Sequence, residues 1–313
     1  MPLIVWVGFI AFILFCLALD LGVFHRKAEA PTLRDALTWT AVWIVVSLLF
    51  GAGVFHYMGH EAGMNYLAGY LVEKSLSLDN IFVIAMIFQY FRIPPENQHR
   101  LLFYGIMGAL VLRGVMIAAG AALVRSFDWT MYFFGALLIW TAWKMTKQGD
   151  EEVHPEANPV VNLAKRWFPV THEMHGEHFT VVKDGVTYLT PMALALVVVE
   201  TSDVIFAVDS IPAIFGITTD PFLVFTSNVF AILGLRALYF ALSWMLGRFR
   251  YLKPAVIFVL AFVGVKMLIM HHYHVPTAVS LAVIVAALAV GVITSLLLTR
   301  GEPPEPIAPE KKP

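Results

Sequence analysis

Charged residues are scarce in this sequence. Only 14% of its 313 residues are Asp, Glu, Lys or Arg, whereas a soluble domain carries roughly a quarter. Cysteine is scarcer still, because Cys16 is the only one, so neither a disulfide framework nor a thiolate metal site is available. No basic segment precedes the first apolar run and no small-residue cleavage site follows it. We therefore expect a retained first helix rather than a signal peptide.

The sequence is instead rich in apolar residues. They make up 59% of the chain, with a mean hydropathy of +0.76, and they form runs long enough to cross a hydrocarbon layer of about 30 Å. The pattern predicts an all-α integral membrane fold in contact with the lipid bilayer. About nine transmembrane helices are expected, at residues 3–24, 37–57, 67–91, 101–124, 129–147, 191–214, 222–247, 254–271 and 276–299.

The basic residues indicate how these helices are oriented. One set of alternate loops holds Arg26, Lys27, Arg34, Arg92, Arg100, Lys147, Lys165, Arg166, Lys183, Arg248, Arg250, Lys253, Arg300, Lys311 and Lys312. The opposite loops hold only Arg125. The positive-inside rule then places the N-terminus outside and the C-terminus in the cytoplasm.

Ionisable residues also fall inside the expected helices. The bases are Lys74, Arg113, Lys144, Arg236 and Lys266, and the carboxylates are Asp20, Glu73, Asp79, Glu200, Asp203 and Asp209. A charge inside a bilayer costs a few kcal/mol or more, so each should be paired or face a cavity. So many groups indicate a function beyond support of a helix bundle.

The rare charges also suggest an internal repeat. Glu73 is followed six residues later by Asp79-Asn80, and Asp203 is followed six residues later by Asp209-Ser210. The next expected helix of each half carries one arginine, Arg113 or Arg236, and the third carries one lysine, Lys144 or Lys266. Chance alignment of apolar sequence is the alternative. The two halves would enter the membrane from opposite sides, as in transporters built from inverted repeats.

The repeat divides the chain into segments. We expect two N-terminal transmembrane helices, a first three-helix repeat, a cytoplasmic loop with a β-hairpin, a second three-helix repeat, a last helix and a disordered Pro-rich tail. Their residues are 1–66, 67–147, 148–190, 191–271, 272–300 and 301–313, respectively.

The acidic helices predict a site for a hard divalent cation, because carboxylate, amide and hydroxyl oxygens suit Mg²⁺, Ca²⁺ or Mn²⁺. On a regular helix Glu73, Ser77 and Asn80 share a face, whereas Asp79 and Asp209 are turned away by about 240°. The four acids would converge only if the helices bend or unwind, and Pro212 marks a candidate break. Alternatively, the acids and bases only pair to stabilise the bundle, and Lys144 snorkels to the cytoplasmic surface.

Several motifs of the sequence resemble the TerC family of integral membrane proteins, in particular its Alx-like branch. They are Leu-Asp20-Leu-Gly-Val-Phe-His25, Glu73-Lys-Ser-Leu-Ser77-Leu-Asp79-Asn80, Ser202-Asp203-Val-Ile-Phe-Ala-Val-Asp209-Ser210-Ile-Pro212 and Phe-Thr226-Ser227-Asn228. The resemblance extends to about residue 300. It implies a fold similar to the LysE-type transporter superfamily, in the bacterial plasma (inner) membrane, and export of manganese coupled to protons or pH.

The resemblance also implies which residues bind the metal. The expected ligands are Glu73, Asp79, Asn80, Asp203, Asp209 and Ser210. Glu200, Asp20 and Ser77 are further candidates, for metal binding or coupling. Asp20 lies at the end of its expected helix and could equally be a partner there for His25 or Arg26. Arg113, Arg236, Lys144 and Lys266 are expected to compensate the charge. Mn²⁺ is then a transported substrate, and we expect no organic cofactor and no nucleic-acid partner.

Residues 148–190 form the one sizeable polar segment. Apolar and polar residues alternate around Asp184-Gly185, which predicts a β-hairpin. His172, His175 and His178 precede the hairpin, and His271, His272 and His274 lie between the last two expected helices. The first group suits cytoplasmic metal collection or pH sensing, and the second suits weak binding of exported metal, but ordinary solvated loops explain both more simply.

Two other functions compete with transport. Two acids on two helices could share a proton, as in an intramembrane aspartyl protease, but the Gly-x-Gly-Asp motif of such proteases is missing. We therefore do not expect an enzyme. A membrane-bound factor that delivers metal to exported or resistance proteins would need the same site, and only ion flux separates it from a transporter.

Overall fold

The structure is a computed structural model of the chain. It describes residues 2–24, 32–127, 129–147, 158–171, 173–243, 252–270, 272–273 and 275–298, with residues 20–24 and 243 described by their backbone alone. The side chain of Asp20, the residues His172, His271 and His274, and the tail 301–313 lie outside this description.

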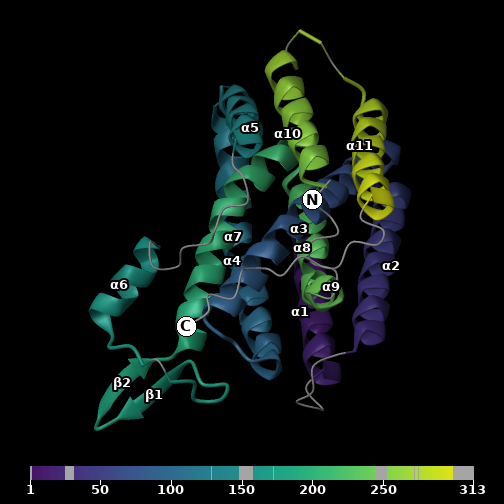
Figure 1. Cartoon of the computed structure of the whole chain (residues 1–313). Helices are drawn as coiled ribbons and strands as arrows, with labels where there is room; N and C mark the ends of the chain where they lie inside the picture. The colour runs from purple at the N-terminus through teal and green to yellow at the C-terminus, as the bar shows by residue number, and fades with distance from the viewer. Residues whose placement is uncertain are drawn as a thin grey trace.

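The described chain is mainly helical, and its long helices lie side by side in a bundle (Figure 1). In chain order the helices are α1 (Leu3–Phe24), α2 (Leu33–Met58), α3 (His60–Tyr90), α4 (Pro95–Ser126), α5 (Thr130–Lys147), α6 (Pro159–Trp167), α7 (Pro191–Phe215), α8 (Pro221–Leu233), α9 (Leu235–Ser243), α10 (Leu252–Ile269) and α11 (Thr277–Leu298). Three of the long helices begin with a proline, whose fixed φ and missing N–H suit a first helical position.

Several helices are long and apolar enough to cross a membrane. Within the described residues these are α2, α4, α7, α10 and α11, and the pair α8 and α9 passes the same test as a span bent by 41°. Helix α3 carries Glu61, Glu73, Lys74 and Asp79, which lower its hydropathy. The chain is therefore an all-α integral membrane protein with several membrane-spanning helices.

The break in the bundle is not where the sequence suggested. The expected helix 222–247 is divided at Gly234, whereas α7 runs unbroken through Pro212, so the expected break there was wrong. Pro212 stands in the last turn of α7, where its missing N–H costs one hydrogen bond. At Gly234 a Cβ atom would lie 3.0 Å from the Lys74 Nζ and 3.1 Å from the Trp43 side chain. The Lys74 ammonium donates to the Ala231 carbonyl (3.1 Å), one of the carbonyls freed by the break.

Helix packing places α3, α4, α7 and α8 at the centre. Helix α3 packs against α7 and α8, α7 packs against α3 and α4, and α5 packs against α10. The α5–α10 crossing is close, because a Cβ atom on Gly135 or Gly264 would lie 2.9 Å from the carbonyl oxygen of the other glycine.

A small module lies at one end of the bundle (Figure 1). Strands β1 (Thr180–Lys183) and β2 (Val186–Leu189) pair antiparallel about Asp184-Gly185, both of which have positive φ (51° and 78°). Such a turn matches the twist of a two-residue hairpin. Helix α6, which the sequence did not predict, precedes the hairpin and packs on α7.

Candidate functional site

A buried arginine joins three central helices. Arg113 on α4 is 2% exposed, and its guanidinium contacts Glu73 on α3 and Asp203 on α7. The Asp203 contact has two points, Nη2 to Oδ1 at 2.8 Å and Nε to Oδ2 at 3.1 Å. Nη1 contacts Glu73 Oε1 and lies 3.5 Å from the Ser210 hydroxyl. The arginine thus brings Glu73, Asp203 and Ser210 together.

Asn228 on α8 completes this cluster. Its Oδ1 accepts from Arg113 Nη1 at 2.9 Å, and its Nδ2 donates to Glu73 Oε2 at 3.3 Å. The sequence pattern gave Asn228 no role, although an amide in an otherwise apolar helix is a signal of a buried polar contact. With both carboxylates ionised, one positive and two negative charges leave the cluster with a formal charge of −1.

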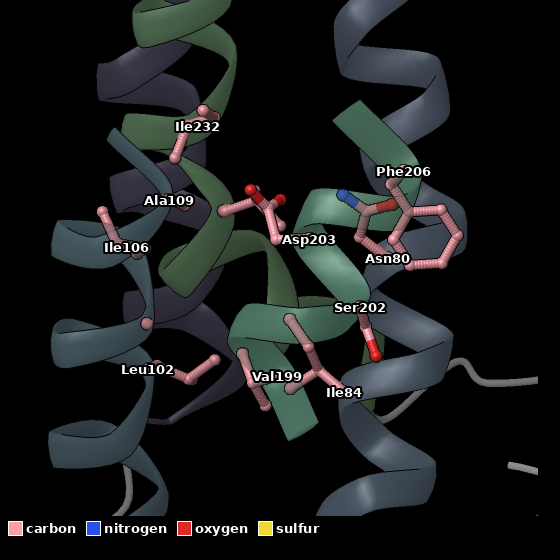
Figure 2. A pocket seen from close by; sticks show the side chains of 12 residues that line it. Asn80, Ile84, Leu102, Ile106, Ala109, Val199, Ser202, Asp203, Phe206 and Ile232 are labelled. Atoms are coloured by element: carbon pink, nitrogen blue, oxygen red, sulfur yellow. The ribbon is translucent and has the colours of Figure 1, made fainter. Parts of the chain in front are cut away.

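A cavity of about 40 Å³ adjoins the cluster. A buried water needs roughly 10–15 Å³, so the cavity has room for a few waters or a partly hydrated cation. Figure 2 shows Asp203 and Asn80 among its lining side chains, which are otherwise mostly apolar. The lining residues are Asn80, Ile84, Leu102, Gly105, Ile106, Ala109, Val199, Ser202, Asp203, Phe206, Ile232 and Leu235.

Some buried oxygens near the cluster have no hydrogen-bond partner within the described chain. They are the Asn80 Oδ1, the Ser77 hydroxyl and the Glu200 Oε2. Glu200 on α7 presses against Gly108 on α4, where a Cβ atom would lie 2.0 Å from Oε1. An unsatisfied buried oxygen is costly, and a cation or an ordered water supplies the missing partner. Of these oxygens, the Asn80 Oδ1 belongs to a residue that lines the cavity together with Asp203.

The other candidate residues lie apart from the cluster. Asp209 accepts a hydrogen bond of 2.8 Å from the Thr141 hydroxyl on α5, and Asp79 lies within electrostatic reach of Lys253. Helices α3 and α7 do not unwind at these positions, so the acids six residues apart point in different directions. Among the described residues no three or more His, Cys, Asp or Glu side chains form a group that could hold a metal.

The remaining bases are distributed over three helices. Arg236 is buried in α9 at 2% exposure. The Lys144 ammonium lies 6.0 Å from the centre of the Trp140 ring near the end of α5, and Lys266 is half-buried in α10. Of the expected charge-compensating residues, Arg113 contacts both Glu73 and Asp203 directly.

The hairpin module, residues 173–190, contacts the start of α4. Arg100 Nη1 forms an ion pair with Glu177 Oε2 at 2.9 Å, and the Asn97 amide donates to the Gly176 carbonyl at 3.0 Å. The Arg100 guanidinium also lies about 6 Å from the ring centres of Tyr104 and Phe179. These contacts connect the module to the helix that carries the buried arginine.

Within the module, the Glu173 carboxylate contacts two basic side chains. The Lys183 ammonium donates to Glu173 Oε2 at 2.7 Å, and His175 lies 3.7 Å from the same oxygen. The hydrogen bond and the charge of Lys183, with a smaller effect of His175, lower the pKa of Glu173. His178, the other described histidine of this group, is not part of this contact.

Known proteins resemble this chain over almost its whole length. The family described as "Integral membrane protein TerC family" matches residues 58–302. An uncharacterized membrane protein of Myxococcus xanthus, STKORF319, is 50% identical over 298 residues, which cover 95% of this chain and 93% of the relative. Alx of Escherichia coli (strain K12), named for a proposed role as a membrane-bound redox modulator, is 46% identical over 290 residues, 90% of each chain. No solved structure matches.

Proposed function

This chain belongs to the TerC family of integral membrane proteins, and on that basis we propose that it is a secondary transporter that exports a divalent metal cation, with Mn²⁺ as the favoured substrate. The observation that carries the proposal is the juxtaposition of a cavity and a buried cluster in which two carboxylates surround one guanidinium. Asp203 belongs to both. Structural pairing alone explains why Arg113 is buried, but it needs only one carboxylate, and the cluster contains two.

The proposal includes nine membrane crossings. They comprise the spans that pass the hydropathy test together with α1, α3 and α5, and the distribution of basic residues puts the N-terminus outside. The cytoplasmic side then holds the hairpin module and the start of α4. In Figure 1 this is the end at which the hairpin lies.

Helix packing supports an inverted repeat in which α3, α4 and α5 correspond to α7, α8 with α9, and α10. Under this correspondence, the contact between α3 and α8 in one half is equivalent to the contact between α7 and α4 in the other. The contacts α3–α7 and α5–α10 each join two equivalent helices of the two halves. Helices α5 and α10 both have 18 residues. Their lysines, Lys144 and Lys266, stand at matching positions, three residues before each helix ends.

The cavity lies on the cytoplasmic side of the cluster in this topology. On α4 its lining residues Leu102 to Ala109 precede Arg113, and α4 starts in the cytoplasm. On α3, which runs toward the cytoplasm, Asn80 and Ile84 follow Glu73. In this proposal a cation binds Asp203 from the cytoplasmic side of the cluster.

The helices pack tightly on the outer side of the cluster in this topology. A Cβ atom on Gly69 would lie 2.9 Å from the Ser227 hydroxyl and 3.3 Å from Ile214, and one on Gly120 would lie 2.8 Å from the Phe215 ring. These residues lie on the outer side of Glu73, Arg113 and their partners along each helix. Alternating access requires this packing to open while the cytoplasmic cavity closes.

The chemistry of the lining suits a hard cation. The Asp203 carboxylate and the Asn80 Oδ1 are oxygen ligands of the kind that Mn²⁺, Mg²⁺ and Ca²⁺ accept. A cation that binds Asp203 competes with Arg113 for the same oxygens. Arg113 retains Glu73 and Asn228 as partners, so it can release Asp203 without becoming unpaired. Protonation of the carboxylates on the outer side would aid release and couple export to pH.

Uptake into inside-out proteoliposomes tests the proposal. Mn²⁺, Mg²⁺ and Ca²⁺ are compared with and without a pH gradient, for the wild type, Asp203→Asn and Asp79→Asn. Asp184→Asn is the matched control, because Asp184 lies in the hairpin turn, where Asn tolerates a positive φ. We expect Mn²⁺ flux that Asp203→Asn abolishes and Asp184→Asn preserves.

Absence of flux for every cation, from protein shown to be folded, would overturn transport. It would favour the second candidate, a membrane-bound factor that holds metal for delivery to exported or resistance proteins. The name of the Alx relatives proposes redox modulation. A thiol–disulfide pair within this sequence cannot serve that role, because Cys16 is its only cysteine.

A further inference from the structure

Helix α6 exposes a continuous apolar stripe. Asn158 caps the helix, with its Oδ1 accepting from the backbone N–H of Val160 (2.9 Å) and of Val161 (3.3 Å). Val160, Leu163 and Trp167 follow one another at spacings of three and four residues and so share one face. They are 43%, 51% and 76% exposed. An exposed tryptophan beside two exposed aliphatic residues marks an unpartnered binding surface.

The inner side of α6 already has its partner. Val161 is 1% exposed, and α6 packs on α7, one of the membrane-spanning helices. The contact holds α6 at the flank of the bundle, beside α7 and next to the hairpin module (Figure 1). The stripe that contains Leu163 and Trp167 is therefore left facing away from the protein.

The polar side of α6 is basic. Lys165 and Arg166 are exposed, the helix contains no acidic residue, and no described carboxylate lies within ion-pair distance of either base. An apolar stripe of aliphatic residues and tryptophan, with Arg166 beside it and Lys165 behind it, is the composition of a helix that lies in the membrane interface. The bases would meet the negative surface of the cytoplasmic leaflet.

We propose that α6 is an interfacial anchor, and that its Val160–Leu163–Trp167 stripe inserts into the cytoplasmic leaflet while Lys165 and Arg166 bind anionic lipid headgroups. The occupant of the stripe is the bilayer that already surrounds α7. The anchor fixes the position of the polypeptide that joins the two halves of the chain. This inference depends on the membrane topology and is independent of whether the protein carries a cation.

The single cysteine makes a direct test practical. In a Cys16→Ser background, a spin label is attached at Leu163→Cys on the stripe or at Lys165→Cys on the basic side. The full-length protein is placed in nanodiscs of phosphatidylcholine with or without phosphatidylglycerol. Collision of the label with oxygen, which concentrates in lipid, is compared with collision with a water-soluble nickel complex.

We expect the label at position 163 to favour oxygen and the label at position 165 to favour nickel. Phosphatidylglycerol should increase the difference, and Arg166→Gln should reduce that increase without unfolding the protein. Equal exposure of both positions to nickel would overturn the proposal, because α6 would then lie in water. Protection of position 163 from both reagents would also overturn it and would point to a second copy of the chain, which cross-linking through the same cysteine would detect.

Discussion

The Arg113 guanidinium meets the Asp203 carboxylate through two parallel contacts, at 2.8 and 3.1 Å, across the interface of α4 and α7. This fork-to-fork geometry is specific to arginine, because a lysine ammonium is a single point charge. The same guanidinium reaches Glu73 through a different nitrogen. One side chain therefore holds two carboxylates from two helices in a fixed relative position.

Replacement of Arg113 by lysine should impair the site even though the charge is kept. The shorter, single-point ammonium cannot bridge both carboxylates, and breaking a buried pair costs about 3–5 kcal/mol. We expect a lower thermal unfolding temperature in detergent and loss of most cation flux. Arg166→Lys, at an exposed position, is the control. Wild-type flux and stability in Arg113→Lys would show that the two-point contact is dispensable.

Asp209 and Thr141 allow the roles of charge and hydrogen bonding to be separated. Asp209→Asn keeps the shape of the side chain and removes its charge, so we expect flux to be abolished while membrane insertion stays normal. Thr141→Val removes only the hydrogen bond of 2.8 Å. Such a bond contributes about 1 kcal/mol, so flux should fall by roughly fivefold or less. Equal, mild effects of both variants would remove Asp209 from the transport site.

Alanine at Gly108 should displace the Glu200 carboxylate. Its added Cβ atom would lie 2.0 Å from the Glu200 carboxylate, so that side chain or the α4–α7 interface must shift. Because the clashing atoms are the mobile end of the Glu200 side chain, the loss of stability should lie toward the lower end of the about 1–3 kcal/mol that overpacking costs. Gly53→Ala is the matched control, because nothing lies within 4 Å of its Cβ position.

A double variant tests the mechanism of this effect. Gly108→Ala combined with Glu200→Ala should recover most of the lost thermal stability, because the clashing carboxylate is gone. Failure of the second substitution to restore stability would locate the strain elsewhere on α4.

Arg100→Ala should loosen the hairpin module without unfolding the bundle. The exposed ion pair with Glu177 contributes about 0.2–1 kcal/mol, and contact with the Phe179 and Tyr104 rings adds about as much. Faster amide hydrogen exchange in residues 173–190 is the expected result. Lys183→Ala, which breaks a pair inside the module, should leave the exchange of α4 unchanged.

The Glu173–Lys183 contact predicts a weakening of the hairpin in acid. Because the pKa of Glu173 is lowered from its ordinary value of 4.5, the pair stabilises the module above that pH. The stabilisation is lost as the pH falls through the lowered pKa. Amide exchange of β1 and β2, compared between the wild type and Glu173→Gln, isolates this contribution. The difference between the two proteins should be present near neutral pH and should vanish in strong acid.

Much of the architecture follows from simple patterns. Long apolar runs predicted the membrane-spanning helices because burial in lipid requires them, and alternation around Asp184-Gly185 predicted a hairpin where the structure has β1 and β2. The six-residue spacing also predicted that Glu73 and Asp79 point in different directions from the same helix. These features depend on neighbours in the sequence.

Contacts between helices could not be read in the same way. Periodicity does not say which helices are adjacent, so it could not select Asp203 and Asn228 as the partners of Arg113. The break at Gly234 depends on the approach of Lys74 and Trp43 from other helices. Helix α6 has only nine residues, too few for a clear period in a polar segment.

The order of the cluster residues along the chain bears on how the protein is made. Glu73 and Arg113 are 40 residues apart, whereas Asp203 and Asn228 follow Arg113 by 90 and 115 residues. The ribosome therefore releases a carboxylate and its guanidinium early, and the two can leave the translocon as a neutral pair. Asp203 is synthesised later, when its partner Arg113 can already be paired with Glu73. The cluster can therefore be completed only after residues from both halves of the chain have been synthesised.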